Sequence, residues 1–212
     1  MTMTLTTSST DTKEQILNAA ERLFAERGFS GTTLRNVVSK AGVNLAAVHY
    51  HFGSKEELFR AAVARFASPV VERELAILDQ LQASDQPLTV EAILTALIEP
   101  CLEFLMENED RRVVRAQFMG RCRTEPGPIQ TIAANEFRES QDAFLDVLQR
   151  VLPDQSRSQL WWKFDLAIAA LIRIQTEAGE PLALLQNTDA ESIQKATKQL
   201  VGFLSAGMRS QL

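Results

Sequence analysis

The residues whose side chains could take part in binding or catalysis lie together in the run 33–55. This run holds both histidines of the chain, His49 and His51, its single tyrosine, Tyr50, and the basic side chains of Arg35 and Lys55. Such side chains can contact phosphate, reach base edges or ligate a metal. On a helix the two histidines are two residues apart and point about 200° apart, whereas paired helical metal ligands are spaced four residues apart. The pattern therefore predicts no metal site.

The rest of the chain contains no recognisable set of catalytic groups. It has no further histidine, no GxSxG, no P-loop and no GxGxxG motif, and its acidic residues are scattered along helix surfaces. The sequence therefore predicts neither an enzyme nor a bound cofactor.

Two short helices are expected to position the side chains of the run 33–55. Thr33 can cap a helix that stops at Gly42, and Asn44 can cap a second helix that stops at Gly53. The tight turn between them predicts a helix-turn-helix, whose second helix enters the major groove of DNA. The side chains left outside, and hence the candidate DNA-binding residues, are Thr33, Arg35, Asn44, Leu45, Ala46, Ala47, His49, Tyr50, His51 and Lys55.

Helical periodicity continues through almost the whole sequence and predicts an all-α protein. We expect a three-helix N-terminal head and a helical C-terminal domain for ligand binding and dimerisation. The expected domains are a disordered tail at 1–11, a helix-turn-helix DNA-binding domain at 12–59 and a ligand-binding and dimerisation domain at 60–212. Beyond the two short helices, the expected helices are 12–27, 54–83 with a kink or restart at Pro69, 89–108, 109–122, 128–151, 155–178 and 188–209.

Composition sets the broad class. With 45% hydrophobic and 23% charged residues, the chain is typical of a soluble globular protein, and no signal peptide or membrane span is expected. Two cysteines without CxxC spacing favour a reduced, cytoplasmic location. The net charge is −5, but residues 1–60 hold seven basic and six acidic residues. This distribution permits DNA binding by the head without requiring it.

The C-terminal part offers a candidate dimer face and a candidate cavity. The last two expected helices are apolar on several sides, which predicts either a four-helix interface in a homodimer or an ordinary intramolecular core. Between them and the head lie large apolar residues and arginines that could line a ligand cavity, although plain core packing is the alternative. The candidate ligand-binding residues are Phe104, Arg115, Phe118, Met119, Phe137 and Phe144. Cys101 and Cys122 could sense oxidation or be buried and inert.

Two segments carry a family resemblance. The run GVNLAAVHYHFGSKEELF (42–59), preceded by AAERLFAERGFSGTTLRNV (19–37), resembles the DNA-binding head of TetR-type transcriptional regulators. The resemblance covers about residues 13–62. The sequence around the second short helix, together with FLSAGMR at 203–209, is similar to the sequences of fatty-acid-responsive repressors of this family.

The resemblance implies roles for nine of the ten candidate DNA-binding residues. Thr33, Tyr50, His51 and Lys55 match positions that contact phosphates, and Arg35 matches a position that can reach a guanine edge. Leu45, Ala46 and Ala47 would lie nearest the bases and meet thymine methyl groups. His49 stands where the family often has tyrosine, so either a phosphate or a base contact is open for it.

Two functions from different classes remain open at this point. The first is a homodimeric repressor that leaves a palindromic operator when a small apolar or amphipathic effector, such as a fatty acid or acyl-CoA, binds. The second is a helical small-molecule or protein-binding module that does not read DNA. Salt dependence discriminates them, because phosphate contacts release counterions.

Overall fold

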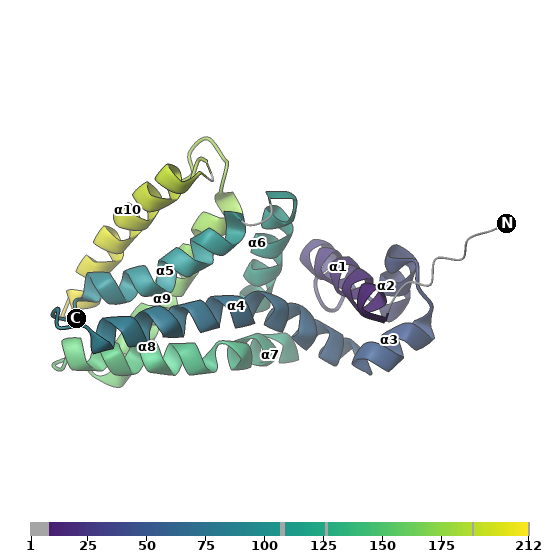
Figure 1. Cartoon of the computed structure of the whole chain (residues 1–212), viewed down its shortest axis with the longest axis horizontal. Helices are drawn as coiled ribbons and strands as arrows, with labels where there is room; N and C mark the ends of the chain where they lie inside the picture. The colour runs from purple at the N-terminus through teal and green to yellow at the C-terminus, as the bar shows by residue number, and fades with distance from the viewer. Residues whose placement is uncertain (1–8, 107–108, 126, 188, 212) are drawn as a thin grey trace.

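The computed structural model describes residues 9–106, 109–125, 127–187 and 189–211. These residues form ten α-helices and no strand, which confirms the all-α prediction. The first three helices make a small head, from which a long fourth helix leads into the remainder of the chain, called the body here (Figure 1). The helices are α1 (Ser9–Arg27), α2 (Leu34–Ala41), α3 (Leu45–Phe52) and α4 (Lys55–Ala83).

Six further helices follow α4 and complete the body. They are α5 (Val90–Met106), α6 (Glu109–Thr124), α7 (Pro128–Glu136), α8 (Arg138–Val151), α9 (Arg157–Glu177) and α10 (Ala190–Arg209). Helix α4 packs against α5, α7 and α8, while α10 packs along α5 and α9. Helix α6 lies on the side of the body that faces the head, where it packs against α1 as well as against α5, α7 and α9 (Figure 1).

The short helices of the head begin and end where the sequence predicts. The side chain of Thr33 accepts the amide of Asn36 in a capping box, and that of Asn44 accepts the amide of Ala47 at 2.8 Å. Gly42 ends α2 with φ at 68°, a left-handed conformation that favours glycine. Local capping therefore sets the angle between α2 and α3.

The structure corrects three expected helix boundaries. Helix α1 begins at Ser9, so residues 9–11 of the expected tail are helical. Helix α4 does not restart at Pro69 but continues through it. The expected helix 128–151 is two helices, because Phe137 has ψ near 0° and interrupts the regular helix while its ring turns toward Phe66. The expected end at residue 108 and the expected start at residue 188 lie outside the described residues.

An aromatic cluster joins the core of the head to that of the body. Phe24 and Phe59 are buried between α1 and α4, with ring centroids 5.2 Å apart. Phe118 of α6 lies 5.3 Å from Phe59 and 6.2 Å from Phe24. The two parts thus share apolar contacts, and movement of α6 must disturb the packing of the head. None of the helices in the described ranges is long and apolar enough to cross a membrane.

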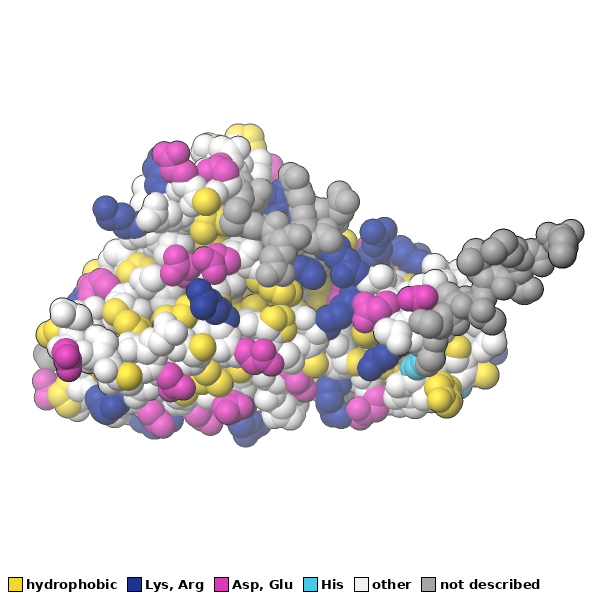
Figure 2. All heavy atoms as spheres, viewed as in Figure 1, with side chains coloured by type: hydrophobic (Ala, Val, Ile, Leu, Met, Phe, Trp, Pro, Cys, Tyr) yellow, Lys and Arg dark blue, Asp and Glu magenta, His cyan; other side chains and the backbone are white. Residues whose placement is uncertain are grey.

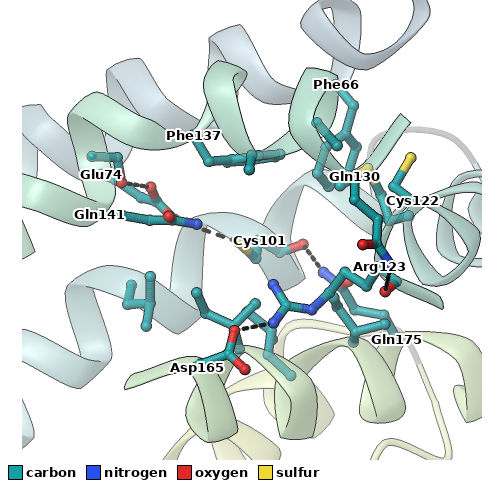
Figure 3. A pocket seen from close by; sticks show the side chains of 18 of the residues that line it. Phe66, Glu74, Cys101, Cys122, Arg123, Gln130, Phe137, Gln141, Asp165 and Gln175 are labelled. Carbon is teal, nitrogen blue, oxygen red and sulfur yellow. Dashed lines mark hydrogen bonds and ion pairs between the residues drawn. The ribbon is translucent and has the colours of Figure 1, made fainter. Parts of the chain in front are cut away.

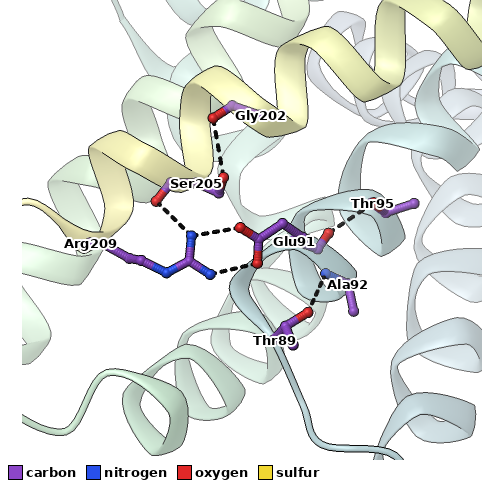
Figure 4. Close-up of polar contacts among 7 residues, drawn as sticks. All are labelled: Thr89, Glu91, Ala92, Thr95, Gly202, Ser205 and Arg209. Atoms are coloured by element: carbon purple, nitrogen blue, oxygen red, sulfur yellow. Dashed lines mark hydrogen bonds and ion pairs between the residues drawn. The ribbon is translucent and has the colours of Figure 1, made fainter.

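Side chains from α5 and α9 hold the C-terminal end of α10. Arg209 forms a two-pronged ion pair with Glu91 at 2.5 and 2.6 Å (Figure 4). These bonds lower the pKa of Glu91 to about 2. On the other side the ammonium of Lys163 donates to the carbonyl of Met208 at 3.1 Å. Helices α9 and α10 are therefore fixed relative to each other and to α5.

Candidate nucleic-acid interface and ligand cavity

Helix α3 presents an outward surface that the fold does not use for packing. Val48 and Phe52 are buried against the head, which turns the other side of the helix outward. Tyr50 is 82% exposed, and its ring meets His51 edge-on at 5.1 Å between centroids. An aromatic side chain this exposed contributes little to stability, so its position favours a role in contact with another molecule.

Thr33 and Asn44, which precede α2 and α3, are exposed and also cap these helices. The hydroxyl of Thr33 donates to Asn36 Oδ1 at 2.8 Å, and Asn44 caps α3. A helix start also presents free backbone N–H groups, which are suited to phosphate. Thr33 and Asn44 therefore place two such helix starts near the outer surface.

His49 is held in one orientation by the end of its own helix. Its Nδ1 lies 2.8 Å from the carbonyl oxygen of Gly53. Because a carbonyl can only accept, Nδ1 carries the proton, and in the neutral ring Nε2 remains as an acceptor. The imidazole is thus preset to accept a hydrogen bond from a base or, when charged, to donate one to a phosphate.

Lys55 has protein partners that the sequence did not suggest. Its ammonium donates to the carbonyls of Phe29 and Thr32, both at 2.9 Å, and lies 4.1 Å from the centre of the Phe29 ring. These contacts use two of its three N–H groups and hold the α1–α2 loop against α4. One N–H remains for the phosphate contact implied by the family resemblance.

The structure brings the ten candidate DNA-binding residues to one end of the molecule, on α2, α3 and the residues flanking them. Figure 2 shows Lys and Arg side chains gathered around this head and its junction with the body. Ala47, His51 and Lys55 are partly exposed. The other seven, Thr33, Arg35, Asn44, Leu45, Ala46, His49 and Tyr50, are exposed.

Polar bonds connect the end of α6 to the head. Arg121 donates to the carbonyls of Ala25 and Glu26 at the end of α1, at 2.6 and 3.0 Å. The carboxylate of Glu125 accepts the amides of Phe29 and Ser30 at 3.0 and 3.1 Å. We call these four bonds the α6 clamp.

A cavity of about 280 Å³ lies in the body between α4, α5, α6, α7, α8 and α9. Its wall is mainly apolar and includes Phe66 and Phe137 (Figure 3). Trp161 is a third aromatic lining residue. Cys122 and Arg123 of α6 also line it, so the same helix end borders the cavity and carries the α6 clamp. A ligand in the cavity would therefore touch the helix that contacts the head.

The cavity contains one deeply buried acid, Glu74 of α4. It is 2% exposed and receives hydrogen bonds from the Ser140 hydroxyl and, at 3.6 Å, from the Cys101 thiol. Burial raises the pKa of Glu74 to about 7, and the bonds from Ser140 and Cys101 only partly oppose this. Arg123 also lines the cavity but pairs with Asp165, apart from Glu74 (Figure 3).

Both cysteines line the cavity as neutral thiols. Burial raises the pKa of Cys122 to about 12 and that of Cys101 well above its usual value, and the nearby acids Glu125 and Glu74 add to these shifts. Thiolate is the reactive form, so both side chains are better suited to packing than to redox sensing.

The candidate ligand residues are dispersed, and only two of the six line the cavity, Met119 and Phe137. Arg115 lies over the Phe104 ring at 4.4 Å, beside the cavity wall. Phe118 belongs to the junction with the head, and Phe144 stacks on Phe164 at 6.0 Å in the core.

Sequence reasoning missed Glu74. A signal was present: the residue stands at four-residue spacing between Val70 and Leu78 on the buried stripe of its helix. An acid in such a stripe indicates a buried carboxylate.

Comparison with known families agrees with this architecture. The model for "Bacterial regulatory proteins, tetR family" matches residues 16–62, and that for "Tetracyclin repressor-like, C-terminal domain" matches residues 95–207. The second match covers more than half of the chain, and the first covers the head. The chain belongs to the TetR family of bacterial regulatory proteins. This confirms the predicted family, which is a family of bacterial regulatory proteins.

Individual relatives and one solved structure extend the comparison. The chain is 34% identical to the transcriptional repressor BepR of Brucella suis over 53% of its own length and 51% of that protein. It is 29% identical to the transcriptional regulator AcrR of Shigella flexneri over 67% of its own length and 65% of that protein. The chain thus spans about half to two thirds of these relatives. The structure of the fatty acid degradation regulator FadR from Bacillus halodurans superposes with a TM-score of 0.65, covering 94% of this chain and 97% of that one. At 14% identity, this likeness indicates the same fold.

Proposed function

We propose that this protein is a homodimeric DNA-binding transcriptional repressor that leaves a palindromic operator when a small molecule occupies the cavity. The observation that carries the proposal is the outward surface of α3, where Tyr50 stands 82% exposed beside His49 and Leu45. Arg35 on α2 adds a guanidinium that can reach a guanine edge. The protein would act in the cytoplasm, where DNA is accessible.

An unpartnered apolar face on the last two helices supports the homodimer. Trp162 and Leu166 are 39% and 56% exposed on α9, and Phe203 is 76% exposed on α10. Beside Phe203, Gly202 has open space where a side chain would be, which allows close approach of another helix. Self-association through a two-fold interface would present two heads to successive major grooves of DNA.

The route from cavity to head passes through α6. Cys122 and Arg123 touch the cavity, whereas Arg121 and Glu125, on either side of them, hold the head. A ligand that favours another position of this helix end would shift the head through the α6 clamp and lower operator affinity by its differential binding. A coupling of about 1–3 kcal/mol changes affinity by about 5–150-fold.

The test is fluorescence anisotropy of the protein with DNA from upstream of its own gene, over a range of salt concentrations. Wild type is expected to bind with an affinity that falls steeply with salt, because phosphate contacts release counterions. Arg35→Ala and Tyr50→Ala are expected to bind far more weakly, while Arg150→Ala, at the far end of α8, leaves binding unchanged. Salt-insensitive binding, or binding indifferent to both head variants, would instead favour a protein-binding or small-molecule module.

A further inference from the structure

The cavity contains a buried acid without a basic partner. Glu74 is 2% exposed, and no Lys, Arg or His within the described ranges forms an ion pair with it. Its partners are the neutral hydroxyl of Ser140 and the neutral thiol of Cys101, which carry no positive charge to balance a carboxylate. An acid in this position opposes stability when it is charged, so the fold alone does not account for it.

The surroundings of Glu74 are suited to a positive charge. Phe66, Phe137 and Trp161 line the same cavity, and the faces of aromatic rings attract cations. The guanidinium of Arg123, which could have attracted an anion, is already bonded to Asp165. An acid together with aromatic walls favours an ammonium group and disfavours the carboxylate of a fatty acid.

The size of the cavity limits the ligand. An apolar cavity of about 150 Å³ holds one benzene ring. A cavity of about 280 Å³ therefore has room for roughly two fused rings with a short substituent. A long acyl chain would extend beyond this volume.

We propose that Glu74 is the charge-recognition residue of the cavity and that the effector is a compact aromatic amine, bound as its ammonium ion with the ring between the aromatic walls. The proposal rests on the proposed function as a ligand-responsive regulator and specifies the chemical class of its ligand. The ammonium supplies the charge partner that Glu74 lacks, and the carboxylate form is then the stable one.

The test compares three probes that share one ring system and differ in charge: 2-naphthylmethylammonium, 2-naphthylmethanol and 2-naphthoate. Binding to the full chain is measured by isothermal titration calorimetry without DNA. The ammonium is expected to bind at least about tenfold more tightly than the alcohol, which corresponds to about 1.4 kcal/mol, and the naphthoate more weakly still. An equal affinity for all three probes, a preference for the naphthoate, or no binding of the ammonium would overturn the proposal.

Variants locate the charge. Glu74→Gln keeps the shape of the side chain and is expected to lose at least about tenfold in ammonium affinity while binding the alcohol as before. Glu72→Gln removes the same charge from the exposed side of α4 and is expected to bind like wild type. Ser140→Ala keeps the acid and is expected to retain the preference for the ammonium. If Glu74→Gln binds the ammonium as tightly as wild type does, the acid is not the recognition group.

The pH profile gives an independent readout. Ammonium affinity is expected to rise between about pH 6 and about pH 8, as Glu74 loses its proton, while the probe stays charged. Among the groups facing Glu74, the Cys101 thiol stays neutral over this range because burial raises its pKa well above the usual value, and the Ser140 hydroxyl carries no charge. Arg123 is already paired with Asp165. A flat profile would contradict the proposal. Because these titrations contain no DNA, they separate an error about the ligand from an error about DNA binding.

Discussion

Glu125→Ala removes half of the α6 clamp and tests whether the head depends on α6. In the wild type, the carboxylate accepts the amides of Phe29 and Ser30 at 3.0 and 3.1 Å, the first partly buried and the second exposed. Gly28 lies so close to this carboxylate that a Cβ there would collide with it. Hydrogen bonds to a charged group contribute about 1.5–3 kcal/mol each, and solvent exposure lowers the share of the second. The expected loss is about 2 kcal/mol, or roughly 4–8 °C in melting temperature.

Urea unfolding gives the change in free energy, and amide hydrogen exchange shows where it arises. The amides of Phe29 and Ser30 are expected to exchange faster in the variant, because each loses its acceptor. The exposed Glu103 on α5 supplies the matched control, and Glu103→Ala should change neither quantity. An unfolding free energy within about 0.5 kcal/mol of wild type, with unchanged exchange at both amides, would refute the clamp.

Three further outcomes follow from the structure. For Glu74, a pKa raised from 4.5 to about 7 means that the folded state holds a proton which the unfolded state releases. Stability should therefore fall by up to about 3 kcal/mol as pH rises through that window, and urea unfolding of Glu74→Gln should lack this decline. For Glu91, with a pKa lowered to about 2, the contribution is present above pH 4.5 and lost as pH falls toward 2. Because the pair is exposed, Glu91→Gln should lower the free energy of unfolding by less than about 1 kcal/mol near neutral pH, measured by thermal unfolding. A larger loss would contradict this expectation. Phe203→Glu should give a folded monomer by sedimentation and circular dichroism, since the ring is 76% exposed in one chain, and a persistent dimer would place the interface elsewhere.

The head could be predicted closely because local residues determine where its helices begin and end. Capping by Thr33 and Asn44 and a left-handed Gly42 depend on residues close to them in the sequence. The outward side chains of α3 then follow from helical periodicity, since Val48 and Phe52 must face inward.

The cavity could not be predicted in the same way, because tertiary packing decides it. The sequence suggested that large apolar residues line the cavity, yet Phe118 and Phe144 pack against other aromatic rings in the core. The break at Phe137 between α7 and α8 has no glycine or proline to mark it. Glu74 becomes significant only when α5 and α8 enclose it with Cys101 and Ser140.

Selection of bound duplexes from a random pool tests the central claim most directly, because it needs no knowledge of the operator. If the head reads DNA as one half of a dimer, the selected sequences should converge on an inverted repeat whose half-sites lie about one helical turn, or a multiple of it, apart. Tyr50→Ala, carried through the same selection, should enrich no such repeat. A pool that does not converge with the wild type, or that converges equally with Tyr50→Ala, would contradict the assignment of α3 as the DNA-reading helix.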